Sequence, residues 1–490
     1  MPFNSYPYFV FLAAVVVGFR LLEKSAPTGR RVFLLLASYA FYAWWRADFL
    51  LLLCGSTLVN YGIGREIERR RVWQQDRRGL LIAGLAFNLG LISLFKYDTL
   101  FVGTANDLMG FGLPLPHFFL PLAISFFTFE QISYLVDADA GKAHNYSLLD
   151  YALFVAYFPH LIAGPIVRHD DLIPQFRAAR PAKNDDLATG LTLFTIGLAK
   201  KSLIADNLAP FADAIFNAAG RGTQLGPTDS WLGTLFFAFQ IYFDFSAYSD
   251  MALGSSVMLG IRLPVNFHSP YKAASIIEFW RRWHISLSAF LRDYLYVKLG
   301  GNRHGRGRRY LNLFVTMLLG GLWHGANWTF MLWGGLHGFY LTINHVFRRA
   351  TKGMAAPPAL RMPLHIASVA LTFSATTLAW IVFRSPDLAS ARNVVGGLFG
   401  AGHSTIVSFS PLAAATLLLL SIIVWLMPNS MELMWRYRPA LPSPYLDQPV
   451  TPARRLAWQP TRLHAAVYGL VCIVAVLALS NLKPFIYFQF

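Results

Sequence analysis

Charged side chains are scarce in this chain of 490 residues. Asp, Glu, Lys and Arg together make up 14% of it, whereas hydrophobic residues make up 55%. A soluble globular domain carries about 25% charged residues, so this composition argues against a separate soluble domain. Several stretches reach the roughly 20 apolar residues that a helix needs to cross a bilayer. We therefore expect an all-α, polytopic membrane protein.

Cysteines and the common metal and nucleotide motifs are also lacking. The only two cysteines, Cys54 and Cys472, lie in apolar segments, which excludes a disulfide framework and a cysteine metal site. The 13 histidines are scattered and form no H-E-x-x-H pattern. A Gly-x-Ser-x-Gly elbow and a phosphate-binding loop are absent as well. We expect no metal and no permanently bound cofactor.

Acidic residues are outnumbered by basic ones. The chain has 25 Asp and Glu against 42 Lys and Arg, which gives a formal net charge of +17. In a soluble protein such a charge suggests nucleic acid, but no nucleic-acid-binding module is present. Lys and Arg accumulate in the cytoplasmic loops of membrane proteins. We therefore expect contact with membrane lipids and no nucleic-acid partner.

The basic residues also predict which side of the membrane each loop faces. The first apolar run, residues 8–19, has no positive charge before it and is followed by Arg20, Arg30 and Arg31. A signal peptide has the reverse charge order. We expect an uncleaved first span with the N-terminus outside. By the same rule the basic stretch 65–78 lies inside and the C-terminus lies outside.

The apolar segments predict about eleven transmembrane or re-entrant helices within one domain, residues 1–490. We expect a core at about 95–350 and C-terminal helices at 363–490. The apolar stretches from which these helices are expected are residues 8–19, 32–46, 49–63, 80–95, 117–136, 150–166, 188–205, 229–261, 311–330, 331–347, 363–383, 409–427 and 464–481. The basic loop 428–463 is expected inside.

Two segments in the middle of the chain are irregular. Residues 150–166 are apolar but contain Pro159, Gly164 and Pro165, which is typical of a broken or re-entrant helix surrounded by protein. Residues 271–310 mix aromatic and charged side chains and are too polar to span easily. We expect either an interfacial helix there or one that dips into a cavity.

Two histidines are candidates for chemistry. His324 lies 14 residues after Tyr310, so at about 1.5 Å per residue the chain has risen roughly 20 Å, past the middle of the membrane. An ionisable residue at that depth is unfavourable unless it is paired or used. We place His284 near the cytoplasmic face, so that the two histidines mark the two ends of one path. The alternatives are a histidine hydrogen-bonded between helices and a snorkelling interfacial residue.

Carboxylates form a second candidate group. Asp244 and Asp250 lie in a long apolar run, and Tyr248 follows Asp244 by four residues, on the same helical face. A buried carboxylate needs a partner. We expect Asp244 to pair with an arginine. The candidate partners are Arg281, Arg282 or Arg292. Glu278 and Arg282, also four residues apart, are expected to pair with each other.

Several blocks of sequence resemble a known family. They are NFHSPYKAASIIEFWRRWHISLSAFLRDYLYVKLGGNR (266–303), GGLWHGANWTFMLWGGLHG (320–338), LPLAISFFTFEQISYLVD (120–137), FPHLIAGPIVRHDDLIPQF (158–176), FDFSAYSDMALGSSVMLGI (243–261) and the terminal PFIYFQF. In this order they are similar to the membrane-bound O-acyltransferase family, and within it to the alginate O-acetyltransferase subgroup. The likeness extends over nearly the whole chain.

The resemblance implies an O-acyltransferase of the bacterial inner membrane, with its helices surrounding a central catalytic cavity. The donor would be cytoplasmic acyl-CoA, in this subgroup acetyl-CoA, and the acceptor an exported polysaccharide on the far side. A periplasmic or membrane-anchored partner of the SGNH type would complete the transfer. The resemblance places the active-site histidine at His324 and a second functional histidine at His284.

The chemistry of acyl transfer suggests further roles. A neutral His324 would act as general base on the acceptor hydroxyl, and Asn327 or a backbone N–H would stabilise the oxyanion. Trp323 would form a flat wall beside the imidazole. Arg281, Arg282 and Arg303 suit the phosphates of coenzyme A. We expect three further residues to support the catalytic histidines: Asp244, Tyr248 and Glu278.

Three other functions fit the same features. A transporter or flippase for a glycan intermediate would use a polar cavity without acyl chemistry, although we find no convincing inverted repeat. A relative that acylates a protein or a lipid would share the catalytic residues. A structural scaffold would not need His284, Asp244 and His324 at membrane depth.

Overall fold

The computed structural model describes most of the chain. The described residues are 1–22, 26–115, 118–143, 145–178, 182–354, 356–403, 406–407, 409–442, 456–480 and 485–486. Part of the expected inner loop 428–463, and the last residues of the C-terminus that we expect outside, therefore lie beyond the described residues.

The described chain folds into helices. The one pairing of extended backbone among the described residues is an isolated bridge between Pro264 and Leu441. In the first half the helices are α1 (Tyr6–Leu21), α2 (Pro27–Ala43), α3 (Ala47–Val72), α4 (Arg78–Ile92), α5 (Asp98–Met109), α6 (Ile124–Ala140), α7 (Leu148–Ala156), α8 (Phe158–Leu161), α9 (His169–Ala178), α10 (Asn184–Ala199), α11 (Asp206–Gly220) and α12 (Pro227–Met258). In the second half they are α13 (Ile276–Arg282), α14 (Ile285–Phe290), α15 (Gly305–His324), α16 (Trp328–Ala350), α17 (Pro358–Arg384), α18 (Leu388–Leu398), α19 (Pro411–Leu426), α20 (Ser430–Leu433) and α21 (Arg462–Leu477).

Four helical segments are long and apolar enough to cross a membrane: Ala47–Val72, Arg78–Met109, Asn184–Gly220 and Pro358–Arg384. Three shorter apolar helices, α1, α19 and α21, accompany them. The expected fold class, an all-α polytopic membrane protein, is confirmed. The number of crossings, about eleven, stays a prediction.

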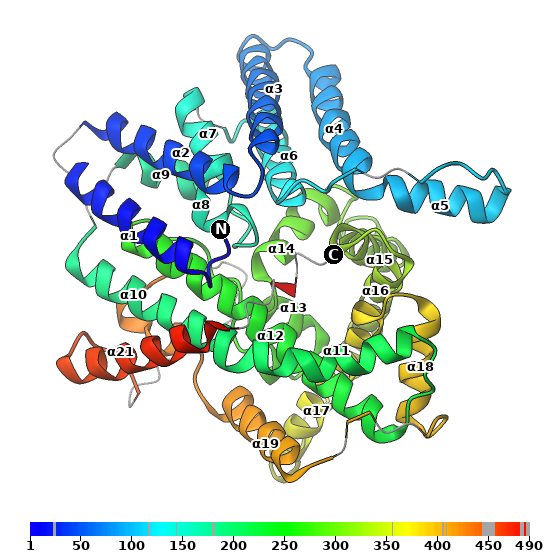
Figure 1. Cartoon of the computed structure of the whole chain (residues 1–490). Helices are drawn as coiled ribbons and strands as arrows, with labels where there is room; N and C mark the ends of the chain where they lie inside the picture. Colours follow the sequence, from blue (N-terminus) through cyan, green and yellow to red (C-terminus); the bar gives the residue numbers. More distant parts are fainter. Residues whose placement is uncertain are drawn as a thin grey trace.

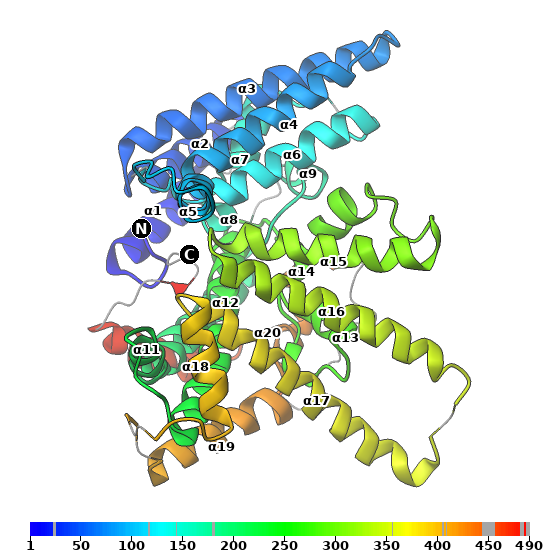
Figure 2. The ribbon, with the colours of Figure 1, turned by 90° about the vertical axis from the view of Figure 1, so that its right-hand side faces the viewer.

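Helix α12 lies at the centre of the molecule. From Leu232 to Met258 almost every side chain of this helix is buried. Helices α10 and α11 pack along it, as Figure 1 shows in green. The first helices, α1–α4, lie on one side of α12, and α17–α19 lie on the other. In Figure 2 the α3–α4 and α15–α16 hairpins lie one above the other, with α17 below them.

The segment 150–166 is broken, as the prolines predict. Helix α7 ends at Ala156, Tyr157 turns the chain, and the four-residue α8 begins at Phe158 with Pro159 in its first turn. All the residues from Asp150 to Val167 are buried. Irregular backbone at membrane depth is tolerated where protein surrounds it, and this segment satisfies that condition.

Residues 271–310 dip into the interior, the second of the two expected arrangements. The short α13 and α14 are followed by a π-helical turn at Leu291–Tyr296. Trp280, Trp283 and His284 are buried, because the aromatic side chains of this segment pack inward. The basic loop is shorter than predicted, since α15 begins at Gly305.

The turn between the next two helices is also earlier than predicted. We expect a break near residue 330, but α15 ends at His324 and α16 begins at Trp328. The cause is local, because Gly325 is extended and the side chain of Asn327 accepts a hydrogen bond from the N–H of Thr329, which caps α16. His324 is consequently the last residue of its helix.

Candidate functional site

His284 and His324 lie side by side in the core. Their ring centroids are 6.5 Å apart, and both side chains are buried. The prediction that they mark opposite ends of one path, with His284 near the cytoplasmic face, is therefore wrong. The reason is the inward dip of α13 and α14, which carries His284 to the C-terminal end of α15. The two imidazoles form one site.

Aromatic rings surround His324. The centroid of Trp333, on α16, lies 5.1 Å from that of the imidazole, and Phe383, at the end of α17, lies 5.4 Å away. Trp323 lies 4.9 Å away and also stacks on Phe129 of α6. Trp323 therefore forms a wall beside His324, in the position that the sequence suggests.

Glycines bring α15 and α16 into close contact beside this site. A Cβ on Gly321 would lie 2.2 Å from the carbonyl oxygen of Phe330, and one on Gly334 would lie 2.3 Å from that of Met317. Small residues allow the backbones of membrane helices to approach closely. This approach fixes how Trp333 meets His324.

His284 is held by Asn266. The backbone of His284 is in the left-handed region, with φ 42°. Its Nδ1 lies 3.1 Å from Oδ1 of Asn266, which also accepts a hydrogen bond from the Ser286 hydroxyl at 2.9 Å. The backbone N–H of Ile285 donates to the Asn266 carbonyl at 3.0 Å. If Nδ1 carries the proton, Nε2 is the basic nitrogen.

A third buried histidine, His337, stands behind this pair. Its Nδ1 accepts a hydrogen bond from the indole N–H of Trp280 at 3.2 Å, and its ring centroid lies 4.8 Å from that of Trp333. His337 is not among the site residues that the sequence predicts. The available signal is its place on α16, thirteen residues after His324, on a helix with few polar side chains.

Asn327 has other partners in this structure. Its amide N–H donates to the carbonyl of Pro386 at 2.7 Å, and its Oδ1 accepts from the N–H of Thr329 at 3.0 Å. The amide oxygen therefore caps the start of α16, and the amide N–H holds the loop between α17 and α18. This arrangement favours a structural role over the predicted stabilisation of an oxyanion.

Asp244 pairs with a lysine. Its Oδ1 lies 2.6 Å from Nζ of Lys201, and its Oδ2 accepts from the N–H of Ile486 at 2.8 Å. The expectation of an arginine partner is wrong, because Lys201 on the turn between α10 and α11 is packed against α12. Tyr248 stacks on Phe3 with centroids 4.5 Å apart. Both residues bind the ends of the chain to the central helix.

Glu278 and Arg282 pair at 2.6 Å, as their spacing predicts. They line a cavity of about 440 Å³ together with Arg281, Arg348 and Asn344. The cavity lies between α13 and the C-terminal part of α16, and its basic side chains suit a polyanion. Arg303 is not among the residues that line it, so the three predicted donor-binding arginines are not brought together.

A second cavity reaches His324 directly. It has a volume of about 160 Å³ and is lined by Lys96, Ser125, Trp323 and His324, with apolar residues of the segment 120–126 around them. Trp45, which lies in the loop between α2 and α3, stands at its edge. Lys96 is not among the site residues predicted from the sequence. A single lysine in the apolar stretch around residues 80–109 is nevertheless a signal of the same kind as the one that indicates His324, an ionisable residue among apolar ones.

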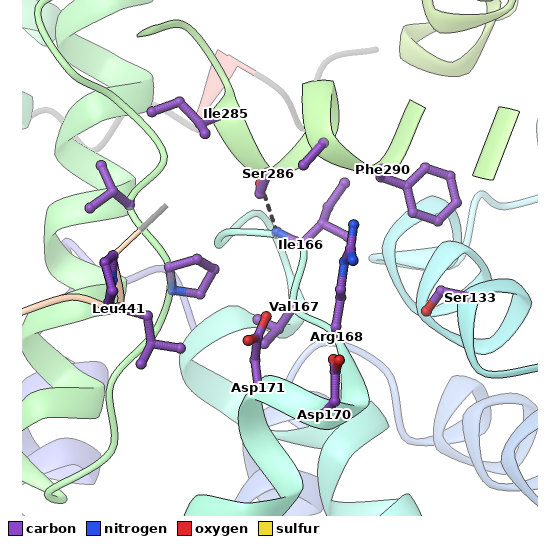
Figure 3. A pocket seen from close by; sticks show the side chains of 14 residues that line it. Ser133, Ile166, Val167, Arg168, Asp170, Asp171, Ile285, Ser286, Phe290 and Leu441 are labelled. Atoms are coloured by element: carbon purple, nitrogen blue, oxygen red, sulfur yellow. Dashed lines mark hydrogen bonds between the residues drawn. The ribbon is translucent and has the colours of Figure 1, made fainter. Parts of the chain in front are cut away.

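A third cavity, of about 130 Å³, lies beside α14. Figure 3 shows Ile166, Arg168 and Ser286 on its walls, with the hydrogen bond between the Ser286 hydroxyl and the N–H of Ile166, at 2.9 Å. Asp170 and Asp171 line its lower side in this view. Two carboxylates make this cavity a poorer site for phosphate groups than the one at Arg281. Within the described residues, no group of three or more His, Cys, Asp or Glu is placed to hold a metal ion.

Comparison with known proteins identifies the family of this chain. The profile of the membrane-bound O-acyltransferase (MBOAT) family matches residues 34–383. The chain is 40% identical over 509 residues to a probable alginate O-acetylase of Pseudomonas putida, with all of both chains covered. It is 41% identical over 431 residues to the peptidoglycan O-acetyltransferase of Helicobacter pylori, covering 80% of this chain and 78% of that one. A teichoic acid D-alanyltransferase of Streptococcus thermophilus is 27% identical over 245 residues, 47% of this chain and 58% of that one.

The helical membrane fold and these matches define a multi-pass membrane enzyme that transfers acyl groups. The chain belongs to the membrane-bound O-acyltransferase family. The resemblance that the sequence blocks suggest is thereby confirmed.

Proposed function

We propose that this enzyme takes an acetyl group from acetyl-CoA at the cytoplasmic face of a bacterial inner membrane and delivers it for O-acetylation of an exported polysaccharide. One observation carries the proposal. The imidazoles of His284 and His324 are buried side by side, one cavity reaches His324, and a separate basic cavity is lined by Arg281 and Arg282, on the segment that leads to His284. The names of the O-acetylating relatives support acetyl and an envelope polymer.

The orientation follows from the basic loops. The basic cavity lies near Arg348 and Arg349, at the end of α16, and the turn that follows His324 lies at the opposite end of that helix. If basic residues mark the inside, coenzyme A enters from the cytoplasm and the acceptor reaches His324 from outside. The N-terminus then lies outside.

In the proposed reaction His324 acts as general base. Its neutral imidazole removes the proton of the acceptor hydroxyl while that oxygen attacks the thioester carbonyl carbon. As the tetrahedral intermediate collapses, the C–S bond breaks, the new ester forms and the thiolate of coenzyme A leaves. A positioned base of this kind contributes about 10²–10⁴-fold to the rate.

His284 and the indoles supply the remaining roles. His284 precedes α14, on the segment that also carries Arg281 and Arg282. Its Nδ1 proton is donated to Oδ1 of Asn266, so its basic Nε2 is available to accept a hydrogen bond beside His324. The departing thiolate takes the proton that His324 removed from the acceptor hydroxyl. The indole N–H of Trp333 is buried and has no hydrogen-bond partner among the described residues. Because Asn327 is occupied elsewhere, Trp333 is the better candidate to donate to the oxyanion. Arg281 and Arg282 bind the phosphates of the donor, while Arg303 lies away from this cavity.

A second protein completes the transfer in this proposal. The buried site is reached through a cavity of about 160 Å³, which admits a small acceptor group and not a polymer chain. A periplasmic or membrane-anchored acyltransferase of the SGNH type would pass the acetyl group to the polysaccharide. Full-rate acetylation of polysaccharide by the purified chain alone would contradict this part.

The base is tested with matched histidine variants. Membrane vesicles that contain the wild type, His324→Ala or His365→Ala receive acetyl-CoA and an acceptor, and released thiol is measured. His365 lies on the exposed surface of α17 and serves as the control. We expect thiol release from the wild type and His365→Ala, and a decrease of at least about 100-fold for His324→Ala. Equal rates for all three proteins would refute the role of His324.

A further inference from the structure

Lys96 and Tyr97 contact the backbone of the helix that ends at His324. They lie on a π-helical turn, Ser93–Tyr97, where α4 passes into α5. Nζ of Lys96 donates to the carbonyl of Trp323 at 2.7 Å and to that of His324 at 3.0 Å. The hydroxyl of Tyr97 donates to the carbonyl of Leu322 at 2.8 Å. Three consecutive carbonyls of α15 are therefore bound from one turn of a neighbouring helix.

These carbonyls need donors from outside their own helix. The last four C=O groups of an α-helix have no partner within it, and Gly325 continues in extended backbone instead of forming a closing turn. The C-terminal end of a helix also carries a partial negative charge, which favours a cation there. Lys96 supplies both a donor and a positive charge at the end of α15, and the phenol of Tyr97 supplies a second donor there.

Two further observations connect this contact to the site. Lys96, Ser125 and His324 line the same cavity of about 160 Å³, and Nζ of Lys96 lies 3.4 Å from the Ser125 hydroxyl. Short π-helical turns within α-helices occur frequently at functional sites, and a lysine among apolar helices is unfavourable unless it is used. A purely structural cap would not need to open onto the cavity.

We infer that Lys96, assisted by Tyr97, is a positioning residue for His324. It fixes the last turn of α15, so that the imidazole keeps its place between Trp333 and Phe383 and faces the cavity. This inference rests on the proposed function of His324. It assigns to the turn 93–97 a part in the reaction that is distinct from binding the donor, whose proposed cavity lies at Arg281.

The test compares the turnover and the donor KM of single and double variants. Lys96→Met keeps the length of the side chain and removes the ammonium group. We expect kcat to fall about 10- to 100-fold, as displacement of a reacting group by about 1 Å does, with KM for acetyl-CoA unchanged. Lys272→Met is the matched control, because Nζ of Lys272 also donates to a carbonyl at a helix end, that of Met427, at 2.8 Å. Its kcat should equal that of the wild type.

A double variant separates positioning from other roles. If Lys96 acts through His324, adding Lys96→Met to His324→Ala causes no further loss. A further loss would show that Lys96 acts independently, for example on the acceptor, and would overturn the inference. So would a folded Lys96→Met protein with a kcat within about twofold of the wild type. If His324→Ala itself keeps full activity, the proposed function fails before Lys96 is considered.

Tyr97→Phe keeps the inference testable if Lys96→Met does not fold. This variant removes one hydroxyl group and leaves the ring in place. Loss of one hydrogen bond of this kind predicts a decrease in kcat of about threefold to tenfold, with a melting temperature in detergent lowered by no more than about 2–4 °C and an unchanged donor KM. An unchanged kcat would refute the positioning role of this turn.

Discussion

At the scale of single residues, the geometry of the site depends on the neighbouring side chains that fix the positions of the two histidines. His324 is the last residue of α15, and its carbonyl accepts a hydrogen bond from Lys96. His284 adopts a left-handed backbone conformation, and its side chain contacts Asn266. A non-glycine residue in that region is strained by about 1–3 kcal/mol. Such strain persists only where surrounding contacts hold it, and here Asn266 supplies them.

Replacing Asn266 by alanine should release His284. The change removes the oxygen that contacts Nδ1 of His284 and accepts from the Ser286 hydroxyl, so we expect a loss of about 1–3 kcal/mol in the free energy of unfolding. Turnover should fall at least about tenfold, because the imidazole is free to rotate. The measurements are thermal unfolding in detergent and thiol release.

Asn106 provides the control for this variant. Asn106 lies in the last turn of α5, and its side-chain amide donates to the carbonyl of Leu113, in the loop that follows, and accepts from the N–H of the same residue, both at 2.8 Å. Asn106→Ala should leave turnover unchanged. A folded Asn266→Ala enzyme with full turnover would show that His284 needs no such support or plays no part.

The residues that sequence reasoning found and missed differ in a physical way. His324 and His284 could be selected because ionisable side chains stand out in apolar stretches, and the pairing of Glu278 with Arg282 follows from helical spacing. Lys201 could not be assigned to Asp244, nor Asn266 to His284, because those contacts join segments that the chain order does not relate. The distance between the two histidines depends in the same way on how α13 and α14 dip inward.

At the scale of elements, the α15–α16 hairpin decides the shape of the site. Its length and the apolar character of its helices can be read from the sequence, but its turn lies several residues before the predicted one because Asn327 caps α16. The close approach of the two helices rests on glycines whose neighbours only the structure reveals. Gly334 meets the backbone of α15, whereas its neighbour Gly335 faces side chains.

Two adjacent glycines therefore give a matched pair of variants. A Cβ at Gly334 would lie 2.3 Å from the carbonyl oxygen of Met317, so the backbone would have to move to relieve the clash. The nearest atom to a Cβ at Gly335 is 3.7 Å away, which is an ordinary contact. We expect Gly334→Ala to separate the helices, to destabilise the protein by about 1–3 kcal/mol and to abolish most of the activity.

Gly335→Ala should behave like the wild type in both measurements, since alanine at that position makes ordinary van der Waals contacts. The unfolding temperature and the rate of thiol release are measured on both variants at equal protein levels in the membrane. Equal behaviour of the two variants would mean that the close contact of α15 with α16 does not determine the geometry around His324.

At the scale of the whole molecule, the helices form one cavity that reaches the buried His324 and a separate basic cavity between α13 and the C-terminal part of α16. Two separate cavities are what the proposed function requires, one for the donor and one for the acceptor. The all-α membrane class and the broken segment at 150–166 were predictable from composition and proline positions. The cavities were not, because their walls combine side chains from helices far apart in the chain.

The most direct test of the account is the amount of alkali-labile acetate on the extracellular glycans of the source cell. A strain without this protein is complemented with the wild type or with His324→Ala at matched membrane levels. The account predicts that the wild type restores the ester and the variant does not. If both restore it, His324 is not the base. If the ester is unaffected by the deletion while glycan export falls, the protein acts in transport and the proposed function is wrong.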